Sequence, residues 1–153
     1  MEAIIILRRC RNAANDIRKL ERRIQLRRDA MLSVTPRLDP NGGSRGGGDP
    51  DLIGRILADI DDLERSMDAR RKAEAVEICA VCIMLDRLTA MESQVLYGYY
   101  VRRESSGEIA KRLNYTAGYI RKIKADGERQ LRGIAGAAVD ALLPEWYREK
   151  EVK

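Results

Sequence analysis

The sequence contains no histidine and no phenylalanine, and it has one tryptophan among its 153 residues. Without histidine, the chain lacks the side chain that most often acts as a general base near neutral pH. A nucleotide-binding loop is also excluded, because the glycines at 42–48 are not followed by Lys-Ser or Lys-Thr. With no paired acids in a plausible cleft, no catalytic constellation can be assembled, and we expect the protein not to be an enzyme.

Cysteine is scarce as well, and the count of three leaves no even-numbered disulfide framework. Cys79 and Cys82 form a C-x-x-C motif, a spacing that also occurs in redox and zinc sites. Three thiols from one chain cannot complete the four-ligand shell of a structural zinc ion. Because the surrounding segment, EICAVCIML, is apolar, we predict buried, reduced thiols and no metal or other cofactor.

Long apolar runs are absent. The opening segment EAIIIL is short and continues directly into RRCRNAAND. A secretory signal needs a longer apolar core with a cleavage site, and a membrane span needs about 20 apolar residues. We therefore expect no membrane association and a cytoplasmic location.

Charged side chains are abundant, at 35% of the residues against 5% aromatics. This composition favours long exposed helices over a thick core, so we predict an all-α fold. The net charge of +5 permits an anionic partner, but a positive balance of this size is common in proteins that bind no nucleic acid.

Residues 1–87 carry the pattern of two long helices joined by a loop. Thr35-Pro36 should end the first helix, and the glycine-rich segment at 39–49 predicts a flexible connection. Asp49 as N-cap and Pro50 at the first helical position predict the start of the second helix. The apolar stripe of the first helix consists of Ile6, Cys10, Ala13, Ile17, Leu20, Ile24 and Met31, and that of the second begins with Ile53, Ile56, Ile60, Leu63 and Met67.

The two helices carry opposite charge. Residues 1–50 hold 11 basic and 6 acidic side chains, whereas residues 51–87 hold 6 basic and 9 acidic ones. Apolar stripes with opposite flanking charge predict an antiparallel helical hairpin of coiled-coil type, with ion pairs beside the seam. The arginine-rich segment ERRIQLRRD then belongs to a solvated, ion-paired face.

Residues 88–132 predict a helix-turn-helix. Capping boxes begin at Thr89 and Ser105, each with a glutamate three residues later. A steep crossing of two short helices needs a small residue, which Ala110 supplies, and a turn residue that tolerates positive φ, which Asn114 supplies. Thr116 can cap the second helix, whose inward positions are Ile120 and Ile123.

On the second helix, the face opposite the inward positions Ile120 and Ile123 is expected to contact DNA. Arg121 can bind guanine through two hydrogen bonds, and Lys122 and Lys124 can serve bases or phosphates. Tyr119 can either pack or bind a phosphate, and the sequence does not separate the two. The predicted DNA-binding residues are Thr116, Ala117, Gly118, Tyr119, Arg121, Lys122 and Lys124. The other interpretation is a helical pair used only for protein contacts.

The segment LTAMESQVLYGYYVRRESSGEIAKRLNYTAGYIRKIKADGERQL resembles the fourth region of sigma-70-type sigma factors. Together with the preceding hairpin, it looks like the RinA/ArpU-like transcription regulators of phages and prophages. The resemblance implies binding to double-stranded DNA through the start of the recognition helix, which corresponds here to Ala117, Gly118, Arg121 and Lys122. The first two are small, whereas sigma factors usually carry longer polar residues there. No segment resembles the sigma region that binds the minus-ten element, so we expect an accessory activator and not a complete sigma factor. Such a protein would activate late genes by recruiting RNA polymerase. We expect it to be a homodimer.

Two other functions remain open at this stage. A small-terminase-like DNA-packaging component also joins a helix-turn-helix to oligomerisation helices, and it would form a ring of many subunits. A helical adaptor would use the hairpin alone and never bind DNA. Residues 133–153 predict a terminal helix and tail, either a helix that closes the core with Trp146 as its anchor or a contact with a sister subunit or polymerase.

Overall fold

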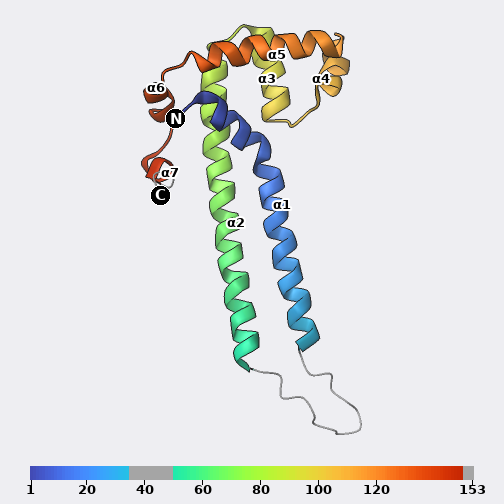
Figure 1. Ribbon diagram of the computed structural model, residues 1–153, viewed down its shortest axis with the longest axis vertical. Helices are drawn as coiled ribbons and strands as arrows, with labels where there is room; N and C mark the ends of the chain where they lie inside the picture. Colours follow the sequence, from blue (N-terminus) through green and yellow to red (C-terminus); the bar gives the residue numbers. More distant parts are fainter. Residues whose placement is uncertain (35–49, 150–153) are drawn as a thin grey trace. The chain divides into compact units, whose positions relative to one another are not determined.

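The computed structural model describes residues 1–34 and 50–149, and every regular element in these ranges is a helix. The all-α prediction is confirmed. Two helices are long, α1 (Ala3–Val34) and α2 (Pro50–Leu85), and five shorter ones follow (Figure 1). None of the described helices is both long enough and apolar enough to cross a membrane. The predicted loop at 39–49 and the predicted N-cap Asp49 lie outside the described residues, but Pro50 does begin α2.

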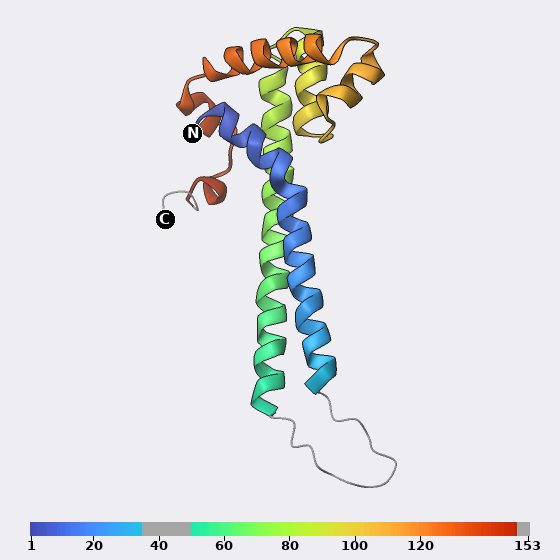
Figure 2. The same ribbon diagram turned by 45° about the vertical axis from the view of Figure 1, so that its right-hand side comes forward.

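The chain divides into two compact units. One unit comprises residues 14–71 and contains the greater part of α1 with the first part of α2. Its two helices run side by side in opposite directions (Figures 1 and 2), which is the predicted antiparallel hairpin. Ile24, Ile56 and Ile60 form its buried seam.

Ion pairs flank this seam, as the charge pattern predicted. Arg28 and Glu64 lie 3.0 Å apart, Arg70 and Asp16 lie 3.4 Å apart, and Arg27 pairs with Asp59 at 3.4 Å. Exposed pairs of this kind contribute little stability each, about 0–1 kcal/mol, but they favour one relative orientation of the helices.

The other unit combines residues 1–13 with residues 72–153. Its core gathers the first turns of α1 and the end of α2 around α3 (Ala90–Tyr100) and α5 (Ala117–Arg132). Fully buried members from these elements include Ile6, Leu7, Met84, Leu96 and Leu131.

The C-terminal elements α6 (Gly136–Asp140) and α7 (Glu145–Glu149) close this core. Val139 and Leu143 are buried in it, and the α-amino group of Met1 pairs with Asp140 at 2.8 Å. The anchor of the last helix is Tyr147, which is 6% exposed, and not Trp146, which is 42% exposed. Tyr147 donates a hydrogen bond of 2.7 Å to the buried carboxylate of Glu77, so its hydroxyl has a partner within the core.

The prediction that the thiols of Cys79 and Cys82 are buried is wrong, whereas Cys10 on α1 is buried. Cys79 is exposed and Cys82 is half-buried, although both lie in an apolar stretch of α2. The core side of this part of the helix is formed by Ala80, Val81 and Met84, so Cys79 lies on the side that the core does not cover. All three cysteines are free thiols, and residues 1–34 and 50–149 contain no group of three or more cysteine or acidic side chains that could hold a metal ion.

Candidate nucleic-acid interface

Helix α4 (Ser106–Leu113) ends in the tight turn that the sequence predicted. Asn114 has φ of 59° and ψ of 45°, which is the left-handed conformation that asparagine tolerates better than most residues. The carbonyl of Ala110 accepts hydrogen bonds from the backbone N–H groups of Asn114 and Tyr115, the second at 3.0 Å. These bonds satisfy a carbonyl group near the end of α4 and redirect the chain into α5.

The start of α5 is capped by Thr116, whose side-chain oxygen accepts a hydrogen bond of 3.2 Å from the backbone N–H of Tyr119. A similar arrangement begins the two preceding helices, where Thr89 and Ser105 form complete capping boxes. At Ser105, these hydrogen bonds lower the pKa of the partner Glu108. The helix starts in this region therefore follow from local sequence signals.

A small apolar cluster fixes α5 against its neighbours. Ile109 and Ala110 of α4 meet Ile120 of α5 and Val95 of α3, and all four side chains are buried. Ile123 and Ala117 pack at the edge of this cluster and are partly buried. The steep packing of α4 and α5 on α3 is a helix-turn-helix (Figure 1).

The exposed face of α5 carries the predicted cations Arg121 and Lys122. Among the residues that the structure describes, neither side chain has an ion-pair partner, so both charges are available to an external anion. Gly118 lies on the same exposed face, and a Cβ atom built on it would meet nothing within 4 Å. The first two turns of α5 thus present two unpaired cations beside a glycine that leaves space above the helix. Base edges and phosphates can bind to a surface of this kind.

Lys124 departs from the prediction of an outward-facing side chain. Its ammonium group pairs with Glu128 at 2.7 Å and lies 4.3 Å from the centre of the Tyr99 ring. The side chain is only 21% exposed. The cation is drawn inward because a carboxylate and an aromatic face are both within its reach.

Tyr119 is exposed and packs against the exposed Tyr115, with their ring centres 5.0 Å apart. This aromatic pair lies beside the turn between α4 and α5. Tyr115 is not among the predicted DNA-binding residues, although its position next to the turn residue Asn114 is a local signal for it.

A second turn residue also has positive φ, and no sequence signal predicted it. Arg103, between α3 and α4, has φ of 61° and pairs with Glu74 of α2. Next to it, Glu104 pairs with Arg112 at 2.9 Å and ties the loop to α4. These contacts hold the entry to the helix-turn-helix in place.

Only part of the chain is similar to a known protein family. Neither the curated proteins nor the solved structures include a significant match to the chain. Residues 84–133, however, match the family described as Sigma-70, region 4. The match spans the end of α2 through α5, and it confirms the predicted region-four-like helix-turn-helix, a DNA-binding domain.

Proposed function

We propose that the protein is a sequence-specific regulator of transcription of the phage or prophage type. It binds double-stranded DNA in the cytoplasm, without catalysis, and activates late genes by recruiting RNA polymerase. The observation that carries the proposal is the pair Arg121 and Lys122, two exposed cations without ion-pair partners in the described part of the chain, on the second helix of a region-four-like helix-turn-helix. The phage and late-gene part of the proposal rests on the resemblance of the sequence to RinA/ArpU-like regulators.

In this mechanism, α5 enters the major groove and α4 crosses the DNA backbone. Arg121 reads a guanine edge through two hydrogen bonds, and Lys122 binds an adjacent base or phosphate. Thr116 and Tyr119 lie at the start of α5, where helix N–H groups and a phenol can bind phosphate oxygens. Polymerase is held by another surface, so that the bound DNA and the enzyme are brought together.

The experiment is a selection of duplexes from a randomised pool, followed by titration of the recovered duplex at two salt concentrations. We expect affinity to fall steeply with salt, because bound phosphates release counterions. The double charge reversal Arg121→Glu/Lys122→Glu should abolish binding. A matched control is Arg18→Glu/Lys19→Glu, which reverses the charge of another exposed, consecutive arginine and lysine, on α1.

Retained binding in the Arg121→Glu/Lys122→Glu variant would exclude α5 as the recognition helix. If the wild-type protein selects no duplex, and the Arg121→Glu/Lys122→Glu variant keeps its biological activity, the protein would be the helical adaptor. Activation itself is measured by transcription from a template that carries the selected duplex, with and without the protein, and by co-purification with RNA polymerase.

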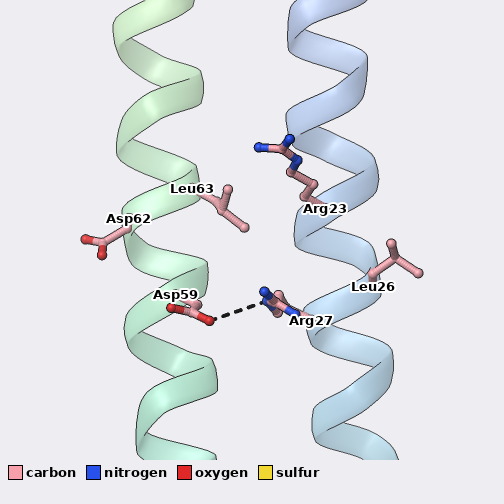
Figure 3. A pocket seen from close by; sticks show the side chains of 6 residues that line it. All are labelled: Arg23, Leu26, Arg27, Asp59, Asp62 and Leu63. Atoms are coloured by element: carbon pink, nitrogen blue, oxygen red, sulfur yellow. Dashed lines mark ion pairs between the residues drawn. The ribbon is translucent and has the colours of Figure 1, made fainter.

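A homodimer is part of the proposal, and the unit of residues 14–71 supplies a surface for it. A groove of about 440 Å³ between α1 and α2 is lined by two leucines, two arginines and two aspartates (Figure 3). Leu26 lines this groove and is 60% exposed, so its burial against a second copy would stabilise the dimer. Arg23 lies on the α1 side of the groove and Asp62 on the α2 side, whereas Arg27 and Asp59 pair with each other across it at 3.4 Å. A second copy related by a twofold axis can therefore place its Asp62 side against Arg23 and its Arg23 side against Asp62.

Mass measurement in solution tests the dimer. The variant Arg23→Glu should be monomeric, and so should Asp62→Arg, whereas an equimolar mixture should restore a dimer. Leu26→Asn should weaken the dimer more than Leu57→Asn, a control on the exposed side of α2 outside the groove. A monomeric wild-type protein would exclude the dimer, and a ring of many subunits would favour the DNA-packaging function.

A further inference from the structure

A second basic feature lies beside the helix-turn-helix and involves α1, which the region-four match does not include. It is a polar pocket of about 240 Å³ with walls from α1, α3 and α5. Arg8, Arg11 and Asn12 form the α1 wall, Tyr99 and Tyr100 the α3 wall, and Lys124 and Glu128 the α5 wall. All of these residues belong to the same compact unit.

The pocket carries a net positive charge, because its one carboxylate is already paired with a lysine in its wall. Glu128 accepts a hydrogen bond of 2.5 Å from the Tyr100 hydroxyl and pairs with Lys124 at 2.7 Å, so its charge is compensated inside the pocket. Among the described residues, neither Arg8 nor Arg11 pairs with a carboxylate. Both guanidinium groups therefore remain without an ion-pair partner in this part of the chain.

The position of Arg11 is fixed by neutral partners. Its guanidinium carbon lies 3.8 Å from the centre of the Tyr99 ring, and it donates hydrogen bonds to the backbone carbonyls of Tyr99 and Glu104. These contacts hold the cation in place without neutralising it. Arg8 and Asn12 lie one helical turn apart on α1, and both side chains are exposed at the edge of the pocket.

The pocket includes residues of α5, and its Arg11 binds the loop that immediately precedes α4. Lys124 lies one turn after Arg121 on α5, and the Glu104 carbonyl that Arg11 binds immediately precedes Ser105, the N-cap of α4. In DNA-bound proteins with this motif, the helix that corresponds to α5 lies in the groove and the one that corresponds to α4 lies across the flanking backbone. In that binding mode, the phosphates at the edge of the groove are the anions expected beside α5 and the start of α4.

We infer that the pocket binds a backbone phosphate of the duplex held by α5, with Arg8 and Asn12 as donors and Arg11 as a fixed positive charge. The first turns of α1 are then part of the DNA interface. Arginine and asparagine are common phosphate ligands, and such contacts position the protein without reading sequence. The inference rests on the proposed DNA-binding function and adds a contact outside the matched domain.

The test compares Arg8→Ala/Asn12→Ala with the matched control Arg22→Ala/Asn15→Ala, which removes the same two residue types from exposed positions of α1 in the other unit. Each protein is titrated with the selected duplex and with a scrambled one between about 50 and 200 mM salt. We expect the pocket variant to bind both duplexes roughly tenfold more weakly, and its salt slope to fall by about 0.9 for each phosphate that it no longer binds. The control should match the wild type.

Equal affinities and slopes for the pocket variant and the control would overturn the inference while leaving the proposed function intact. Absence of salt-dependent binding by the wild-type protein would instead overturn the proposed function itself. If Arg8→Ala/Asn12→Ala no longer binds inorganic phosphate but keeps its duplex affinity, the pocket takes a free anion and the inference is wrong.

Uncharged methylphosphonate groups placed one at a time along the selected duplex locate the phosphate. At one flanking position, the substitution should weaken binding by the wild-type protein but have little effect on Arg8→Ala/Asn12→Ala, because that variant has no donors for the phosphate. Additive effects at every position would contradict a direct interaction between the pocket and the DNA backbone.

Discussion

The backbone N–H of Asn114 donates a hydrogen bond to the carbonyl of Ala110, and Asn114 itself has left-handed backbone angles. Ala110 is also one of the buried residues at which α4 meets α5. One short segment therefore supplies both the small contact residue and the turn that the helix-turn-helix needs. The direction in which α5 leaves α4, and with it the exposure of Arg121, depends on this pair.

Replacement of Asn114 tests the turn. Asn114→Ala should lower the free energy of unfolding by about 1–2 kcal/mol, because a β-carbon without a local polar group is disfavoured at positive φ. Asn114→Gly should be neutral or slightly stabilising. Chemical denaturation measures both, and Asn15→Ala in the right-handed helix α1 is the control that should not destabilise. Equal stability of Asn114→Ala and Asn114→Gly would contradict the turn argument.

Arg121→Lys separates base recognition from simple charge. Lysine keeps the positive charge but cannot form the planar pair of hydrogen bonds that arginine makes with guanine. We expect the variant to bind scrambled DNA as well as the wild type does, while its discrimination in favour of the selected duplex falls by about 1–3 kcal/mol. Competition titrations with both duplexes measure this difference. Unchanged discrimination would mean that Arg121 contacts phosphate only.

The hydrogen bond between Tyr147 and Glu77 is expected to hold α7 on the core. Tyr147→Phe removes the donor of the 2.7 Å bond to a carboxylate that is 2% exposed, which should cost about 1–3 kcal/mol of stability. The exposed Tyr115→Phe should change stability by less than about 0.5 kcal/mol. A double-mutant cycle with Glu77→Gln checks the pairing, and a coupling energy of zero would show that the two residues act independently.

Acid should weaken the unit that contains the helix-turn-helix partly through Glu128. Burial alone would raise the pKa of this carboxyl, but the hydrogen bonds from Lys124 and Tyr100 outweigh it, and the pKa is lowered. A lowered pKa means that its contribution is fully present above the ordinary value of 4.5 and is lost as the pH falls through the folded-state pKa.

Glu128→Gln should therefore flatten the acid limb of the stability curve, measured as denaturation midpoints across that range. Asp126→Asn, nearby on α5 and paired with Arg129, is the control. An unchanged acid limb in Glu128→Gln would exclude this contribution.

The three thiols should react at different rates with an alkylating reagent. Cys79 is exposed and should react first, whereas Cys10 is fully buried and should react only on unfolding. Cys82 should be slow, because burial and then the nearby Cys79 and Asp86 raise its pKa and reduce the thiolate fraction. Mass spectrometry of timed samples gives the order, and early modification of Cys10 would contradict the packing of α1.

Much of the architecture could be predicted from the sequence because its signals are local. Thr89, Ser105 and Thr116 cap their helices through bonds that span three residues, and Asn114 meets a steric demand of its own backbone. The antiparallel hairpin followed from apolar spacing and from the opposite charge of two long segments. Such signals depend on neighbours along the chain, so they are visible without coordinates.

Only the tertiary structure decided which side chains are engaged by distant partners. Lys124 turns inward because the Tyr99 ring of α3 comes within its reach in addition to Glu128 one helical turn away, and Arg103 adopts positive φ where it meets Glu74. Tyr147, and not Trp146, closes the core because Glu77 accepts a hydrogen bond from its hydroxyl and Arg9 donates one to it. These outcomes depend on the packing of helices far apart in sequence, whose contacts no local pattern specifies.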